Sequence, residues 1–213
     1  CTRREVCKSD GRTDVSTPHG AGRTVRPPPP QQNLEIAATR GFEAVGKQAA
    51  EQLVWLGAQP AEYGWQVPVL NNVFGVDLSA KRVSTSAGQG VGPRWTILAL
   101  HYLAIISRPE EQTPEVTFAD LATARSYAGV YHGRVVARLC ATVGRDAQRL
   151  GAAASALGGR EGACAAGDAA FDFCVFPRVS VRLVWHAPDE EFSPSATLLL
   201  PANIESYFCA EDI

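Results

Sequence analysis

Apolar residues recur along this chain at spacings that change from helical to extended. Between Asn33 and Gly57 they return every three or four positions, which predicts a helix that these two residues cap and end. Segments 65–70 and 73–78 are rich in β-branched and aromatic residues and flank Asn71-Asn72, a pair typical of a two-residue turn. This pattern predicts a β-hairpin early in the folded part of the chain.

The next segments predict an edge strand, a loop and a buried helix. Pro68 favours an edge position for its strand, because proline has no N–H to donate to a neighbouring strand. Residues 84–92 are polar and glycine-rich, which is typical of a loop. Pro93 then opens a predicted helix over 95–107 that contains His101 and is apolar almost all round. We expect this helix to be central in the core.

Two further periodic regions complete the predicted fold. Residues 133–157 carry a long apolar stripe that a glycine pair terminates, and Gly144 is a point at which this helical region can divide in two. Apolar and polar residues then alternate over 171–175, and segments 179–185 and 195–200 favour strands. Helices between an early hairpin and late strands predict an α+β fold. We expect a single domain with an N-terminal β-hairpin, several core helices and a C-terminal antiparallel β-meander.

Composition separates residues 1–32 from the rest of the chain. The 213 residues are 46% hydrophobic and 20% charged, which is enough for one well-cored domain plus a tail. Residues 1–32 are rich in arginine, serine and threonine and include the proline run 27–30, so we expect a disordered or extended tail there and one domain over 33–213. Such a leader also resembles the remnant of an organelle transit peptide. We expect a cytoplasmic protein. If the leader is a transit-peptide remnant, the alternative is a protein inside a plastid or mitochondrion.

Charge and hydropathy argue against two classes of partner. The formal net charge is −2 and the pI is about 6.1, so no basic surplus is available to neutralise the phosphates of nucleic acid. The longest strongly apolar run, 95–106, is shorter than the roughly 20 residues that cross a bilayer. We expect a soluble protein without membrane insertion. The cysteines show no regular disulfide pattern, and Cys140 and Cys174 are expected to be buried, reduced thiols.

Acidic residues between two predicted strands are the first candidates for a binding site. Asp189, Glu190 and Glu191 are consecutive there, and carboxylates gathered in a turn can supply oxygen ligands to a hard cation. A solvated turn that keeps a sheet edge soluble is the more ordinary interpretation. Nucleophile, phosphate-loop and zinc-protease motifs are missing from the sequence, so we assign no catalytic residue and no metal ligand.

Histidine and tyrosine residues supply the other candidates. His101 comes first, because a histidine on an apolar helix costs stability unless its ring nitrogens are paired. A buried imidazole bonded to a backbone carbonyl is its simplest interpretation. His132 and His186 lie beside predicted turns, where a general base or ligand can sit, although surface histidines fit the pattern too. Tyr127 and Tyr131 can line a groove for a flat ligand or partner, or belong to the core.

Several ordered blocks of the chain carry a resemblance to a known family: residues 98–103, 118–133, 156–159, 178–185, 188–196, Tyr207 and 211–213. They look like the family catalogued as Domain of Unknown Function 3786, and the resemblance covers residues 34–213. Some members carry an added four-cysteine iron-sulfur domain like that of the corrinoid-linked carbon monoxide dehydrogenase/acetyl-CoA synthase system. The resemblance therefore implies an association with one-carbon or corrinoid metabolism. Cys1 and Cys7 cannot supply the four thiolates of such a cluster, so the cofactor stays unknown.

These observations favour a non-catalytic accessory protein that binds a partner protein or a cofactor, or that forms a subunit of a larger assembly. The alternative is a metal- or cofactor-dependent enzyme of one-carbon or corrinoid metabolism. It would use His101, His132 or His186 with the carboxylates of residues 189–191, and convergence of these side chains on one pocket would support it. A tail ordered against another chain would instead favour the assembly subunit.

Overall fold

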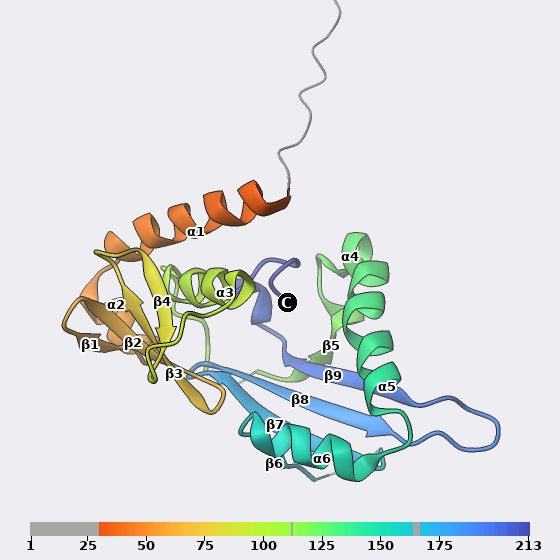
Figure 1. The fold of residues 1–213 in the computed structure, drawn as a ribbon. Helices are drawn as coiled ribbons and strands as arrows, with labels where there is room; N and C mark the ends of the chain where they lie inside the picture. Colours follow the sequence, from red (N-terminus) through yellow and green to blue (C-terminus); the bar gives the residue numbers. More distant parts are fainter. Residues whose placement is uncertain (1–29, 112, 164–166) are drawn as a thin grey trace, which may run out of the picture.

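The computed structural model describes residues 30–111, 113–163 and 167–213. Over these residues the chain has an α+β fold, as the sequence predicts, with two antiparallel sheets of four and five strands surrounded by helices (Figure 1). Residues 1–29 of the predicted tail lie outside the described residues, and residues 30–32 begin the first helix. No helix in the described ranges has the length and hydropathy that a bilayer span needs.

The first predicted helix is in fact two helices, α1 (Pro30–Gly46) and α2 (Ala50–Trp55). The predicted cap at Asn33 is wrong, because α1 already contains that residue and begins at a proline, which the first turn of a helix tolerates. The predicted end at Gly57 is confirmed. Gly57 follows α2 with a φ of +84°, a left-handed conformation that glycine adopts without a steric cost.

Tertiary hydrogen bonds account for the break between α1 and α2. The side-chain amide of Gln48 donates to the carbonyl oxygens of Leu103 at 3.4 Å and Ile105 at 2.9 Å. These two carbonyls lie at and just after the end of the central helix, where carbonyl groups lack partners within the helix. The chain becomes extended at Ala49 and re-enters a helix one residue later. A continuous helix was therefore a wrong prediction, because periodicity carries no information about these distant acceptors.

The first sheet has the order β1-β2-β3-β4 and consists of β1 (Gln59–Ala61), β2 (Gly64–Val69), β3 (Asn72–Asp77) and β4 (Arg82–Thr85). The predicted hairpin is confirmed as β2 and β3. Its turn comprises Leu70 and Asn71, one position earlier than predicted, because the last residue of β2 pairs with Asn72. The N–H of Leu70 donates to the carbonyl oxygen of Val175 at 3.1 Å, so a strand of the second sheet helps to hold this register.

Strand β2 lies between β1 and β3, so the predicted edge position is wrong. Strand β1 pairs only with residues 64–66 of β2 and stops short of Pro68. The proline therefore lies where β2 has a ladder to β3 alone, which is the local environment that proline needs. The predicted loop over 84–92 begins later than expected, since its first two residues belong to β4.

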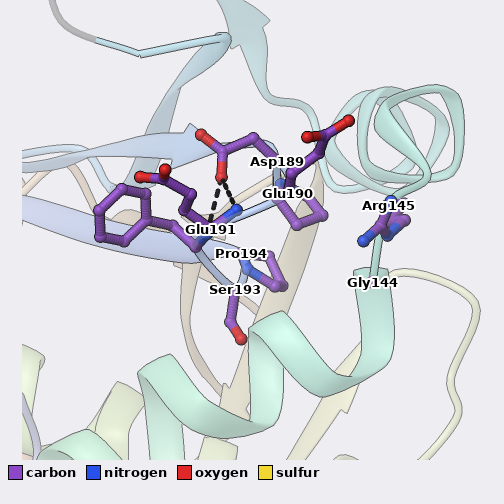
Figure 2. A pocket seen from close by; sticks show the side chains of 9 residues that line it. Gly144, Arg145, Asp189, Glu190, Glu191, Ser193 and Pro194 are labelled. Atoms are coloured by element: carbon purple, nitrogen blue, oxygen red, sulfur yellow. Dashed lines mark hydrogen bonds between the residues drawn. The ribbon is translucent and has the colours of Figure 1, made fainter.

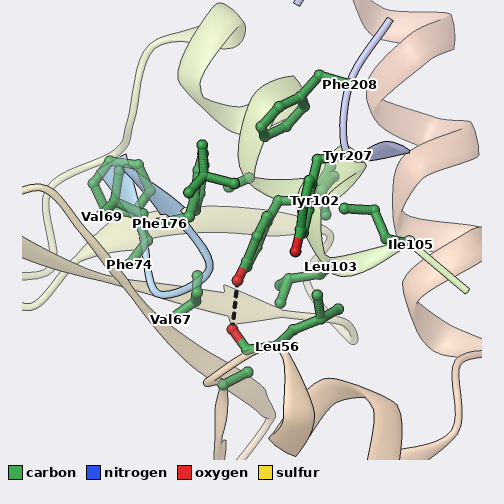
Figure 3. Packing of buried hydrophobic residues seen from close by; sticks show 14 of the residues in the cluster. Leu56, Val67, Val69, Phe74, Tyr102, Leu103, Ile105, Phe176, Tyr207 and Phe208 are labelled. Carbon is green, nitrogen blue, oxygen red and sulfur yellow. Dashed lines mark hydrogen bonds between the residues drawn. The ribbon is translucent and has the colours of Figure 1, made fainter. Parts of the chain in front are cut away.

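The central helix is α3 (Pro93–Leu103), and its predicted place in the core is confirmed, although it ends four residues before the predicted 107. Leu100, Tyr102 and Leu103 are completely buried, and apolar residues of both sheets pack around them. The ring of Tyr102 stacks on Phe176 with 4.4 Å between centroids, and its hydroxyl donates to the carbonyl oxygen of Leu56 at 2.6 Å (Figure 3). One core thus joins the helix to the ends of both sheets.

The second sheet has the order β5-β9-β8-β7-β6 and consists of β5 (Glu115–Thr117), β6 (Arg160–Glu161), β7 (Ala169–Phe176), β8 (Val179–His186) and β9 (Ser195–Pro201). The meander β7-β8-β9 confirms the prediction, and two short strands extend it on both edges. The predicted burial of Cys174 is wrong: it is exposed, because it shares the more polar face of β7 with Asp172. Cys140 is buried, as expected.

The predicted helical region 133–157 begins earlier than expected, at residue 124. It comprises α4 (Ala124–Tyr131), the π-helical turn η2 (His132–Val136), α5 (Ala137–Val143) and α6 (Ala147–Ala156). The predicted division at Gly144 is confirmed, with a φ of +60° there. Helices α5 and α6 cover one face of the second sheet around Trp185. The single 3-10 turns η1 (Phe118–Asp120) and η3 (Ile204–Ser206) precede α4 and the last described residues.

Candidate functional site

The acidic residues predicted as a site lie in the loop between β8 and β9 (Figure 2). Oδ1 of Asp189 accepts hydrogen bonds from the N–H groups of Phe192 at 2.7 Å and Glu191 at 2.8 Å, and these bonds lower the pKa of the Asp189 carboxyl. Asp189 therefore closes its own loop. Among the described residues no three histidine, cysteine or acidic side chains are placed to hold a metal ion, and the loop lines a hollow of about 380 Å³.

A larger hollow, of about 660 Å³, lies elsewhere in the molecule. It is formed by α1, α3, α4, η2 and the segment 209–212 near the end of the chain, and we call it the C-terminal cleft. Two of the predicted site residues, His101 and Tyr127, line it. In Figure 1 these elements surround the chain end marked C, and the acidic loop lies at the opposite end of β9. The cleft is therefore separate from the acidic loop.

An ion pair between His101 and Asp212 lines the cleft. Nδ1 of His101 is 2.7 Å from Oδ2 of Asp212, and this hydrogen bond raises the pKa of the imidazole. The same oxygen accepts a hydrogen bond from the thiol of Cys209 at 3.4 Å. The simplest prediction for His101, a buried ring bonded to a backbone carbonyl, is wrong. Its partner is a carboxylate from 111 residues away, and its side chain is 37% exposed.

The raised pKa of His101 affects the protonation of its ring. His101 holds its proton over a wider pH range, so the neutral ring that could abstract a proton is present only at higher pH. Desolvation also raises the pKa of the Cys209 thiol, so that thiol is not the activated thiolate that a cysteine nucleophile requires. The thiol donates a hydrogen bond to the carboxylate of Asp212, which also pairs with His101. While it pairs with His101, this carboxylate does not act as the base that would activate the thiol as a nucleophile.

Further charged and polar side chains, from α3, α4 and η2, reach the C-terminal cleft. The hydroxyl of Tyr127, on α4, donates to Oε1 of Glu211 at 3.3 Å. Arg94 comes from the first turn of α3 and Arg134 from η2. Sequence reasoning singled out neither arginine as a site residue, and it did not pair Asp212 with His101. No local signal marks these residues, since the chain segments that carry them meet only in the folded protein.

The remaining predicted residues do not join the cleft. The ring of Tyr131 stacks on Phe118 with 4.0 Å between centroids, beside the main core, and burial raises its pKa. His132 is exposed and lies within η2, so its predicted place beside a turn is wrong. His186 ends β8 opposite Ser195. The structure thus does not bring the three histidines together with the acidic loop.

Comparisons with known proteins identify a family and no reaction. No curated protein and no solved structure matches this chain. A family model matches residues 48–213, a range that contains all of the C-terminal cleft except its residues on α1. Its description is a domain of unknown function, DUF3786. Because the match spans well over half of the sequence, the chain belongs to the DUF3786 family, which confirms the resemblance noted in its sequence blocks.

Proposed function

We propose that this chain is an accessory protein that binds a cofactor or another small molecule in the C-terminal cleft without converting it chemically. The observation that carries the proposal is the His101–Asp212 pair within a hollow of about 660 Å³. That volume lies in the range of small-molecule sites, which are mostly apolar hollows with a few fixed polar groups. An ion pair between two segments of the chain keeps such polar groups in place before a ligand arrives.

Native mass spectrometry tests this proposal, on the full chain isolated anaerobically from its own organism. We expect a stoichiometric added mass. Ala37→Trp fills the cleft from α1 and should remove that mass, whereas Ala152→Trp, at an exposed position on α6, should retain it. A wild-type chain that carries no added mass would contradict the proposal. The same spectra report a bound protein partner, which would make the chain a subunit of an assembly.

A metal- or cofactor-dependent enzyme of one-carbon or corrinoid metabolism is the second candidate, and one observation favours it. Asp212 occupies Nδ1 of His101, so Nε2 is the nitrogen left for a metal, as in histidine ligands oriented by a carboxylate. An iron-sulfur cluster does not fit the described residues. Cys140, Cys174 and Cys209 lie on three different elements, and no cluster of three metal-ligating side chains forms among the residues described.

Metal analysis of the same anaerobic preparation separates the two candidates. Stoichiometric cobalt that is lost in His101→Gln would support the corrinoid-linked enzyme. Cobalt-free protein with an organic added mass would support the accessory protein. The control is His132→Gln, because His132 is exposed and outside the cleft, and it should leave the metal content unchanged.

A further inference from the structure

Two arginines in the C-terminal cleft have no ionic partner in the part of the chain that the structure describes. Arg94 and Arg134 both line the hollow, and neither guanidinium forms an ion pair or hydrogen bond with another described residue. They belong to elements far apart in the sequence, the first turn of α3 and the π-helical turn η2. A guanidinium offers a planar fork of donors that matches carboxylate and phosphate groups. Two such groups at one hollow are therefore suited to an anion.

The acidic residues of the cleft already have partners. Oδ2 of Asp212 accepts from His101 and from Cys209, and the carboxylate of Glu211 accepts from Tyr127. The two arginines equal these two carboxylates in number, but the carboxylates are already bonded and the guanidinium groups are not bonded to any described residue. The hydrogen-bond donors that remain available to a ligand are therefore mainly those of the two guanidinium groups.

Apolar side chains lie beside these charges. Arg94, Leu98 and His101 follow one another at positions i, i+4 and i+7 of α3, which places them along one face of the helix. Leu34 and Ala37, three residues apart on α1, line the same hollow. Along the cleft face of α3 the guanidinium of Arg94 comes first, the apolar side chain of Leu98 second and the imidazole of His101 third. This order is complementary to a molecule that has an apolar body and a charged group.

The π-helical turn that carries Arg134 lies at the edge of the second core. None of the residues of η2 is fully buried, and Val136 packs against that core while partly exposed. A π turn is rare and is retained most often at functional sites, because it gives up regular helical hydrogen bonding. Here it separates α4, which supplies Tyr127, from α5, which covers the second sheet.

We infer that the C-terminal cleft binds an amphipathic anion, a carboxylate or phosphate on an apolar body, with Arg94 and Arg134 holding the anionic group. This inference rests on the proposed function, namely that the cleft binds a small molecule. The apolar body lies against Leu34, Ala37 and Leu98. The shared chemistry is an oxyanion that accepts from two guanidinium groups.

A matched pair of fluorescent probes tests the inference on the full chain. Anilinonaphthalene sulfonate carries an anionic group, and phenylnaphthylamine has the same rings without it. We expect the sulfonate to bind roughly tenfold or more tightly, because hydrogen bonds to charged groups are the stronger ones. Arg94→Gln with Arg134→Gln should abolish that preference and leave phenylnaphthylamine binding unchanged. Arg149→Gln, at an exposed position on α6, is the matched control and should keep the preference.

The outcomes separate this inference from the proposed function. If both probes bind equally and Ala37→Trp blocks both, the cleft binds small molecules but the anion preference is wrong. If neither probe binds, the proposed function fails as well. Displacement of the sulfonate by octanoate or by octyl phosphate, and not by octylamine, would support the inference and tell carboxylate from phosphate. Equal displacement by octylamine would overturn it.

Discussion

Nδ1 of His101 lies 2.7 Å from Oδ2 of Asp212, and this contact fastens the segment after η3 to the central helix α3. The hydrogen bond raises the pKa of His101 in the folded protein, against the partial burial that would lower it. A group with a raised folded pKa binds its proton more tightly in the folded state than in the unfolded state. The pair therefore stabilises the fold fully below the unfolded value of about 6.5, and this contribution is lost as the pH rises through the folded pKa.

Replacement of His101 should thus cost more stability in mild acid than in base. We expect the difference in unfolding free energy between wild type and His101→Gln to be larger at about pH 6 than at about pH 9. Urea denaturation at both pH values measures it. His132→Gln removes an exposed histidine outside the cleft and should show no such pH dependence. A difference that is the same at both pH values would contradict the proposed role of the ion pair.

We expect the hydroxyl of Tyr102 to contribute far more to the free energy of unfolding than the hydroxyl of a surface tyrosine does. It donates to the carbonyl oxygen of Leu56 at 2.6 Å and accepts from the N–H of Arg178 at 3.2 Å, in a fully buried position. Tyr102→Phe leaves both backbone groups without a partner, which should cost about 1–3 kcal/mol. Tyr63→Phe, at a residue 59% exposed, should change the unfolding free energy little. Equal effects in the two variants would rule out this hydrogen-bond pair as a source of stability.

Gly41 sets the close approach of α1 to α3. A Cβ at this position would lie 2.8 Å from Cβ of Leu100, nearer than side-chain carbons approach. Gly41→Ala should therefore destabilise the protein by about 1 kcal/mol or more, because overpacking outweighs the better helix propensity of alanine. Gly129→Ala on α4, where a Cβ meets nothing within 4 Å, should instead stabilise by about 0.5–1 kcal/mol. Thermal unfolding of both variants measures the difference in sign.

We expect Asp189 to stabilise the conformation of the loop between β8 and β9. Its carboxylate accepts from two backbone N–H groups of that loop, so Asp189→Ala should lower the melting temperature and leave probe binding in the C-terminal cleft unchanged. Glu190→Ala with Glu191→Ala should leave the melting temperature nearly unchanged, as exposed substitutions usually do. If the double variant unfolds at a markedly lower temperature than Asp189→Ala, the loop depends on its other carboxylates.

Local pattern was sufficient for much of the fold. The alternation in β7 and β8, the apolar run of α3 and the breaks at Gly57 and Gly144 were all predicted from neighbouring residues. These features depend on side-chain period and on backbone conformations that glycine allows, and both are local properties. The same local information identified His101 as the residue most worth following, because a polar ring on an apolar helix requires a partner.

The tertiary structure alone decided what those partners are. Gln48 ends α1 by bonding to carbonyls at the end of α3, and Leu70 shifts its turn by bonding to Val175. In the same way, Asp212 reaches His101 across 111 residues, and Arg94 and Arg134 meet at one hollow. Each of these contacts joins segments that are distant in the chain, so none leaves a periodic or spacing signal. The sequence by itself determined the elements and the leading candidate residue, and the packing of α1, α3 and the last segment determined the site.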